Sequence, residues 1–124
     1  MKYLLDSNII IALVLGIGDS LRERAAACDA NDMVTSAIAF AEVAYGSQTG
    51  RPPAFVELQA FVEEVPVLDF DYKAALTYAA LPFKRASYDR LIAAHAISRD
   101  LVLVTDNRSD FSDLPELRVE NWMI

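Results

Sequence analysis

The chain has 124 residues, with 11 Lys and Arg against 18 Asp and Glu, so its formal net charge is −7. This length suits one domain, residues 1–124, with a full core, and a hydrophobic content of 54% excludes a disordered chain. The single cysteine, Cys28, excludes a disulfide framework and a zinc site built from thiolates, which favours a reducing cytoplasm.

Short apolar strands and helices are expected to alternate along the first half of the chain. Tyr3–Leu5 is expected to be a strand, and Asp6, Ser7 and Asn8 are residue types that start helices. The further elements expected here are helices over Ile9–Leu15, Leu21–Ala30, Ala37–Tyr45 and Pro53–Glu64 and a strand over Met33–Thr35. The longest apolar stretch, Ile9 to Gly18, has ten residues, about half of what a membrane span needs, so no membrane partner is expected.

The second half continues the same alternation. The elements expected here are strands over Val65–Leu68, Leu101–Val104 and Arg118–Glu120 and helices from Asp71 to Ala80 and from Ser87 to Arg99. Short apolar strands that alternate with helices indicate an α/β fold, in which a parallel sheet is covered on both faces. Ligands of such sheets bind beyond the carboxyl ends of the strands, so polar side chains at those ends are the candidates for a site.

Three carboxylates stand where a functional role competes with a structural one. Asp6 follows the first strand, where it is equally suited to cap the next helix. Glu42 is the one charged residue in the segment AIAFAEVAY and is costly to bury unless it is paired or bound to a metal, although an exposed stripe would also accommodate it. Asp89 lies in the first turn of an expected helix, where the helix dipole alone favours an acid.

Further polar residues follow the last buried strand, namely Thr105, Asp106 and Asn107 and then Asp110, for which a turn is the structural explanation. Clustered carboxylates repel one another, which raises their pKa values unless a cation neutralises them. Oxygen ligands without Cys or His clusters favour Mg²⁺, with Mn²⁺ as a substitute. Such ions activate water and stabilise charge on a transferring phosphoryl group, so the sequence predicts a hydrolytic site with one or two metal ions.

Four segments carry a resemblance to a known family. They are LLDSNIIIAL, AEVAYG, YDRLIAAHAISRDLVLVTDN and LRVENW, in this order and across nearly the whole chain. The chain resembles a PIN domain, and more narrowly the VapC toxins of VapBC toxin–antitoxin modules. The resemblance implies a Rossmann-like three-layer α/β/α fold with a short central parallel sheet, Mg²⁺-dependent endoribonuclease activity and inhibition by a VapB-type antitoxin.

The same resemblance assigns roles residue by residue. Asp6, Glu42 and Asp89 match three catalytic acids of the family, of which Asp6 and Asp89 hold the metal. The fourth position falls on Asn107, where other members carry Asp; an amide can coordinate a metal or hold a water but adds no negative charge. The supporting residues are Ser7, Asn8, Asp106 and Asp110, of which the last two are candidates to supply the missing charge. The stretch before Asp89 is also short relative to many members.

A local basic stretch offsets the acidic charge near the expected site. From Lys84 to Arg99 four basic residues stand against Asp89, so the local charge is 4 − 1 = +3 with His95 neutral. The candidate contacts for RNA phosphates are Lys84, Arg85 and Arg90, with Arg108 from the other side, although a solvated helix face explains the same charges. His95, Cys28 and Trp122 are interpreted as packing residues, not as a general base, a reactive thiol and a stacking ring.

The leading hypothesis is therefore a ribonuclease toxin that acts as a homodimer, because a mean hydropathy of +0.24 is high for a lone domain. The candidate interface helices are Leu21–Ala30 and Pro53–Glu64. One alternative is a catalytically weak PIN-like module that binds RNA or protein, which the amide of Asn107 favours. The other is a phosphotransferase or phosphatase with Asp6 as nucleophile, against which Asn8 occupies the place where such sites usually carry a second acid.

Overall fold

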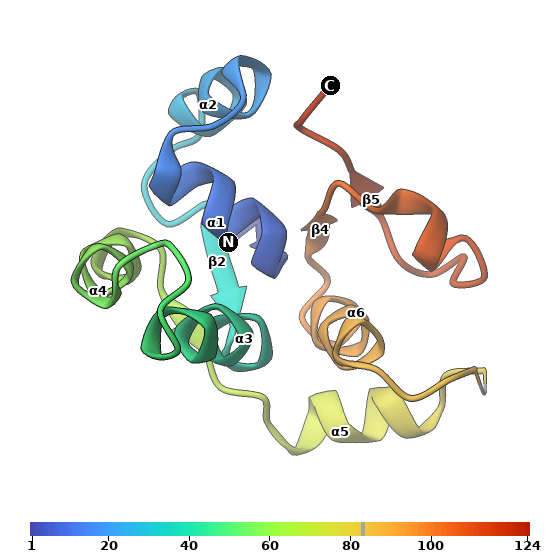
Figure 1. Cartoon of the computed structure of the whole chain (residues 1–124). Coiled ribbons are helices and arrows are strands. Elements are labelled where there is room, and N and C mark those ends of the chain that lie inside the picture. The colour runs from blue at the N-terminus through green and yellow to red at the C-terminus, as the bar shows by residue number, and fades with distance from the viewer. Residues whose placement is uncertain (83) are drawn as a thin grey trace.

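The computed structural model describes residues 1–82 and 84–124 and contains a parallel five-stranded sheet with the strand order β3-β2-β1-β4-β5 (Figure 1). The strands are β1 (Tyr3–Leu5), β2 (Met33–Ser36), β3 (Val67–Leu68), β4 (Val102–Val104) and β5 (Val119–Glu120). The helices are α1 (Ser7–Leu15), α2 (Asp19–Ala26), α3 (Ala37–Gln48), α4 (Phe55–Glu64), α5 (Tyr72–Ala79) and α6 (Tyr88–Ser98), with a 3₁₀ turn η1 (Arg108–Phe111). The expected α/β fold with a short parallel sheet is confirmed.

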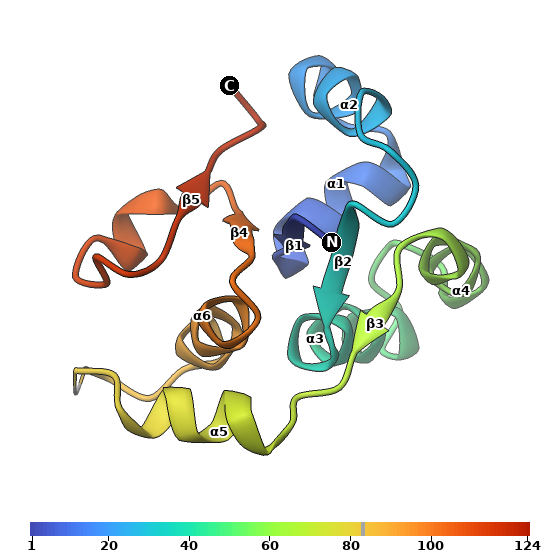
Figure 2. The ribbon, with the colours of Figure 1, turned by 180° about the vertical axis from the view of Figure 1, so that it is seen from behind.

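The central strand β1 pairs with β2 on one side and with β4 on the other. Chain connections leave β1 in both directions along the sheet, so the carboxyl end of β1 is the switch point at which open α/β sheets bind ligands. Figures 1 and 2 show that α1 to α4 group around β2, whereas α5 and α6 lie together below β4. Leu4 and Leu5 of β1 and Leu103 of β4 are fully buried, so the centre of the sheet is also the centre of the core.

Several element boundaries differ from the expected ones. The helix α1 begins at Ser7 because Asp6 itself is the N-cap and accepts a hydrogen bond from the Ser7 backbone N–H. The helix α3 continues through Gly46 to Gln48, and the last turn closes with backbone hydrogen bonds from Thr49. The helix α4 begins at Phe55 and α2 ends at Ala26, each shorter than expected, and η1 was not predicted.

The three residues interpreted as packing residues lie against the core. His95 is fully buried, with Nδ1 2.8 Å from Ser36 Oγ and its ring edge-to-face with Phe70. Trp122 is 1% exposed and packs edge-to-face on Tyr3 at a centroid distance of 4.8 Å. Cys28 is half-buried against the core rather than fully buried. No helix in the described ranges is long and apolar enough to span a membrane.

Candidate active site

Asp6 lies at the carboxyl end of β1 and is 3% exposed. Its Oδ1 accepts a hydrogen bond from the Ser7 backbone N–H at 2.8 Å, and its Oδ2 accepts one from Thr105 Oγ1 at 2.8 Å. Burial raises the pKa of Asp6; the two hydrogen bonds lower it, and the charges of Asp89 and Asp106 raise it further. Asp6 therefore caps α1 and also presents a buried carboxyl to neighbouring acids, so its structural and functional explanations coexist.

Two other elements bring their acids to the same edge of the sheet. Burial is the largest cause that raises the pKa of Glu42 on α3; the charges of Asp6 and Asp89 add to it, and a hydrogen bond with the Ser7 side chain opposes it. Burial also raises the pKa of Asp89 on α6, with a further contribution from the charge of Asp110. Because these carboxyls perturb one another, the structure brings Asp6, Glu42 and Asp89 close together from three separate segments, and the space beside these three acids is called the acid pocket below.

An unsatisfied oxygen in this acid pocket fits a divalent cation. Glu42 Oε1 is buried and has no hydrogen-bond partner within residues 1–82 and 84–124. A buried carboxylate oxygen without a partner is costly, and a cation beside it removes that cost. In the same residues no three His, Cys, Asp or Glu side chains come together closely enough to hold a metal ion by themselves, so a cation bound here would also need water ligands. Such a set of carboxylates suits Mg²⁺, which keeps several waters and takes one or two carboxylates.

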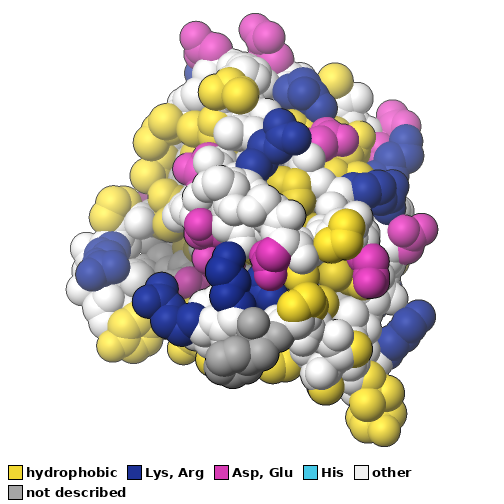
Figure 3. All heavy atoms as spheres, turned by 90° about the vertical axis from the view of Figure 1, so that its right-hand side faces the viewer, with side chains coloured by type: hydrophobic (Ala, Val, Ile, Leu, Met, Phe, Trp, Pro, Cys, Tyr) yellow, Lys and Arg dark blue, Asp and Glu magenta, His cyan; other side chains and the backbone are white. Residues whose placement is uncertain are grey.

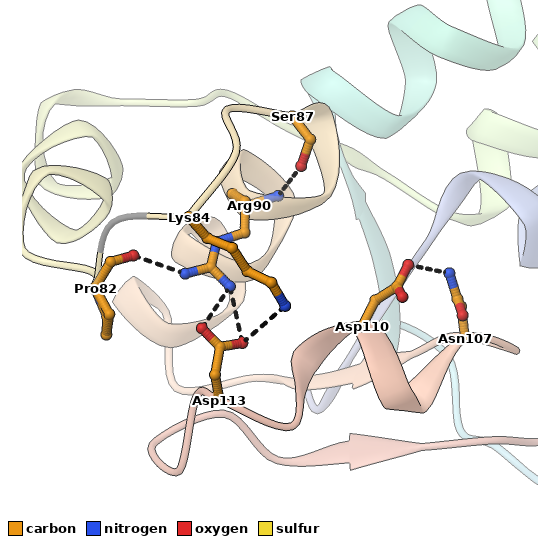
Figure 4. A network of polar contacts seen from close by, with 7 residues as sticks. All are labelled: Pro82, Lys84, Ser87, Arg90, Asn107, Asp110 and Asp113. Atoms are coloured by element: carbon orange, nitrogen blue, oxygen red, sulfur yellow. Dashed lines mark hydrogen bonds and ion pairs between the residues drawn. The ribbon is translucent and has the colours of Figure 1, made fainter.

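The fourth position of the site contains an amide and a neighbouring acid. Asn107 is the residue before η1, and its side-chain Nδ2 donates a hydrogen bond to Asp110 Oδ2 (Figure 4). Asp110 lies close enough to raise the pKa of Asp89. Asp106 is exposed, and its Oδ1 accepts a hydrogen bond from Asn8 Nδ2 at 3.3 Å. Asp106 and Asp110 were the two candidates to supply the charge that Asn107 lacks. Of these, Asp110 is the one hydrogen-bonded to Asn107.

The expectation that Arg90 contacts phosphates is wrong in this structure. Arg90 is 5% exposed, and its guanidinium lies inside the molecule. Nη1 bonds both oxygens of Asp113 at 3.0 and 3.1 Å, and Nη2 donates to the Pro82 carbonyl at 2.9 Å (Figure 4). Ser87 caps α6 by accepting from the Arg90 backbone N–H. Arg90 is therefore a tie between the segment before α6 and the segment after η1, because Nη1 and Nη2 both bond to these segments.

The other three basic candidates remain on the surface. Lys84 lies 3.8 Å from Asp113, with about half of its side chain exposed. Arg85 and Arg108 are exposed and form no ion pair with any described residue. Figure 3 shows basic and acidic side chains next to one another on the face drawn there. A small cavity of about 150 Å³ is lined by basic and acidic side chains together, namely Lys84, Arg85, Ser87, Asp89, Arg90 and Asp110.

Sequence reasoning noted Thr105 only as part of a turn and missed its contact with Asp6. Thr105 is fully buried and connects the end of β4 to the end of β1. The contact could have been predicted from the pairing of β1 with β4, but the order of strands in the sheet cannot be read from the sequence. Asp113, the partner of Arg90, was likewise missed because 23 positions separate the two residues in sequence.

Comparison with known proteins places the chain in a family. Residues 3–117 match the PIN domain family. The chain is 31% identical to the "tRNA(fMet)-specific endonuclease VapC" of Salmonella typhimurium and 30% identical to the "Ribonuclease VapC2" of Haemophilus influenzae; the matches cover 98% and 99% of both chains in each pair. It also resembles the VapBC2 structure from Rickettsia felis bound to promoter DNA, with a TM-score of 0.86 at 29% identity over 98% of this chain and 99% of that one. DNA-bound VapBC from Salmonella typhimurium gives a TM-score of 0.85 at 31% identity over 98% of both chains. This chain therefore belongs to the PIN domain family, within its VapC branch.

Proposed function

We propose that the chain is a divalent-metal-dependent endoribonuclease and the toxin of a toxin–antitoxin pair. The observation that carries the proposal is the buried, unpartnered Glu42 Oε1 in a pocket whose three acids all have raised pKa values. A pocket of this kind is poised for a cation and for phosphoryl chemistry. The ribonuclease and endonuclease names of the relatives support RNA as the substrate.

In the proposed mechanism each residue has a separate task. Asp6 and Asp89 would hold Mg²⁺ or Mn²⁺, which when bound stabilises charge on the phosphoryl oxygens and favours deprotonation of water. The hydrogen bonds from Ser7 N–H and Thr105 Oγ1 fix the orientation of Asp6. The Glu42 carboxylate accepts a proton from the attacking water as the water oxygen bonds to phosphorus; the bond from phosphorus to the ribose oxygen breaks, and that oxygen takes up a proton from solvent water. Asn107 orients Asp110 beside Asp89.

The test of this function is cleavage of RNA by the purified chain. We expect cleavage with Mg²⁺ or Mn²⁺ and none with excess EDTA, with recovery when the metal is added back. Asp89→Asn is the negative control, because it removes one acid with little change in shape. Cleavage that continues undiminished in excess EDTA, or in the Asp89→Asn variant, contradicts the metal mechanism.

We also propose that a VapB-type antitoxin inhibits the chain. The support is the solved toxin–antitoxin complexes of the relatives, together with the acid pocket, which offers carboxylates to a basic side chain. An Arg placed among Asp6, Glu42 and Asp89 would form charge-assisted bonds and compete with the cation. Coexpression of the small protein encoded beside this chain should abolish toxicity, and replacing its Arg at the pocket with Ala should restore cleavage without dissolving the complex. Toxicity that no neighbouring product relieves contradicts this part.

One observation favours a second function, a module that binds RNA without cutting it. The fourth position presents an amide in place of an acid, and that amide is bonded to Asp110. The cleavage assay separates the two functions, because a binding module retains RNA affinity and shows no metal-dependent product.

A further inference from the structure

A second cavity opens beside the acid pocket, on the side of α3. It has a volume of about 490 Å³ and is lined by Ile38, Ala41, Glu42, Tyr45 and Tyr88. Glu42 is shared with the acid pocket, so the cavity is continuous with the site. The other four side chains carry no charge, which makes this cavity chemically unlike the acids beside it.

Two aromatic rings are exposed where the cavity opens. Tyr45 of α3 is 74% exposed and Tyr88 of α6 is 61% exposed. Packing therefore accounts for little of either ring. Exposed aromatic rings beside a nucleic-acid site are the usual platforms on which unpaired bases stack. The rings come from the two elements that also supply Glu42 and Asp89, so their position relative to the acids is fixed by the fold.

The small cavity with the basic side chains also borders the start of α6. Ser87 lines the small cavity with Lys84 and Arg85, whereas the next residue, Tyr88, lines the aromatic cavity. Asp89 follows directly and lines the small cavity, whereas Glu42 lines the cavity with Tyr88. An RNA strand that crosses the first turn of α6 therefore meets basic side chains, then the acids, then aromatic rings.

We propose that the Tyr45–Tyr88 cavity is a nucleobase subsite that receives an unpaired base next to the phosphate that is cut, while Lys84 and Arg85 hold the backbone at the small cavity. This inference rests on the proposed ribonuclease function and adds the place at which an unpaired base beside the cut phosphate would stack, between Tyr45 and Tyr88. A base held in a duplex cannot leave its partner to stack on these rings without the cost of unpairing.

The test uses a fluorescent 12-nucleotide single-stranded RNA of mixed sequence, and the same RNA annealed to its complement. Affinity is measured by anisotropy in EDTA, so that binding is read without cleavage. We expect Tyr45→Ala and Tyr88→Ala each to weaken single-strand binding roughly 10-fold, and Tyr45→Phe and Tyr88→Phe to stay within about 2-fold of the parent. Tyr72→Ala is the matched control, because Tyr72 is 78% exposed on α5 and lines neither cavity.

Salt dependence separates stacking from phosphate contact. The Tyr→Ala variants should keep the parent slope of log affinity against log salt, whereas Lys84→Gln should reduce that slope by about one ion. The duplex should bind more weakly than the single strand and respond little to the Tyr→Ala changes.

Three results would overturn the subsite. They are unchanged single-strand affinity in both Tyr→Ala variants, an equal loss in Tyr72→Ala, and a change in oligomeric mass of the Tyr→Ala variants by light scattering, which would assign the rings to a protein interface. A parent that binds the single strand through the two tyrosines but never cuts it removes the ribonuclease function and leaves the subsite. If the parent cuts RNA while the Tyr→Ala variants bind the single strand normally, the ribonuclease function stands and the nucleobase subsite is wrong.

Discussion

Thr105 Oγ1 donates a hydrogen bond to Asp6 Oδ2 at 2.8 Å, and this bond joins the carboxyl ends of the neighbouring strands β4 and β1. It is one of the two hydrogen bonds that lower the pKa of a carboxyl whose burial raises it. The ionised form of Asp6, which is the form that binds a cation, therefore depends on a residue outside the acid set.

Replacing Thr105 with Val should raise the pKa of Asp6 further, because Val has nearly the same shape but no hydroxyl donor. We expect roughly 10-fold weaker Mg²⁺ activation and an acid limb of the cleavage rate that moves to higher pH. The matched control is Thr35→Val, which removes a buried hydroxyl that donates to the Leu5 carbonyl at 2.8 Å. Both variants should lose similar thermal stability, but Thr35→Val should keep the parent pH profile. Identical pH profiles for all three proteins would contradict the role of Thr105.

Asp6→Asn and Asp89→Asn should each lower cleavage more than ~100-fold while the protein stays folded. Asp89→Asn is also the cleaner test of stability, because burial and Asp110 raise the pKa of Asp89 with no hydrogen bond opposing them. The folded state therefore binds the Asp89 proton more tightly than the unfolded chain. The free energy of unfolding therefore includes a contribution from binding this proton. That contribution is complete below the unfolded pKa of about 4 and is lost as the pH rises through the raised pKa of the folded state.

It follows that, without metal, Asp89→Asn should melt at a higher temperature than the parent at pH 7, and that the gain should shrink toward pH 4. Saturating Mg²⁺ should reverse the order at pH 7, since the parent alone retains the ligand. Melting curves at the two pH values, with and without Mg²⁺, measure this. A variant that melts below the parent in metal-free buffer at pH 7 would show that Asp89 is structural.

Asn107→Asp should keep or increase cleavage at saturating Mg²⁺, because the new carboxylate restores the more acidic arrangement of the family. In metal-free buffer it should lower the melting temperature, since the Asn107 amide now bonds Asp110 and a carboxylate would repel it. The two readouts are the cleavage rate and the shift of the melting temperature on adding Mg²⁺. A large loss of cleavage at saturating Mg²⁺ would show that the neutral amide is required.

Arg90→Met should destabilise the fold, because it removes the donor to the Pro82 carbonyl and leaves Asp113 with the more distant Lys84 as its one remaining ion-pair partner among the described residues. Arg90→Lys should recover only part of this loss, since one ammonium cannot reproduce the two-directional guanidinium contacts. The control is Arg108→Met, an exposed change expected to stay within about 0.5 kcal/mol. Urea unfolding measures all three, and an Arg90→Met variant as stable as the parent would contradict the tie.

A homodimer is expected in solution, and the structure distinguishes the candidate helices. In α2 the one buried residue is Leu21, and the helix carries no large exposed apolar side chain. Val56 of α4 is 71% exposed and Leu76 of α5 is 53% exposed. We expect a dimeric mass by light scattering at micromolar concentration, and a shift toward monomer in Val56→Glu or Leu76→Glu. A monomeric parent at every concentration contradicts the dimer.

The sequence predicted those features whose signals are local. The helix starts at Ser36, Asp71 and Ser87 are side-chain caps in the structure, because a cap is defined by a hydroxyl or carboxylate and the few backbone N–H groups after it. The acids Asp6, Glu42 and Asp89 could be named because each is out of place in its own apolar segment. Arg90 was misjudged because its burial depends on Asp113, and no rule of local sequence connects these two positions.

The contact between Thr105 and Asp6 spans 99 positions of the chain, and this separation determines when the acid pocket can form during synthesis. A chain still on the ribosome cannot form this contact until Thr105 has been made and has emerged. Strand β1 cannot complete its pairing before β4 exists. Chemistry at the acid pocket therefore starts only after β4 and Thr105 have been made. An inhibitor that is already present before then would meet the acid pocket as soon as the pocket forms.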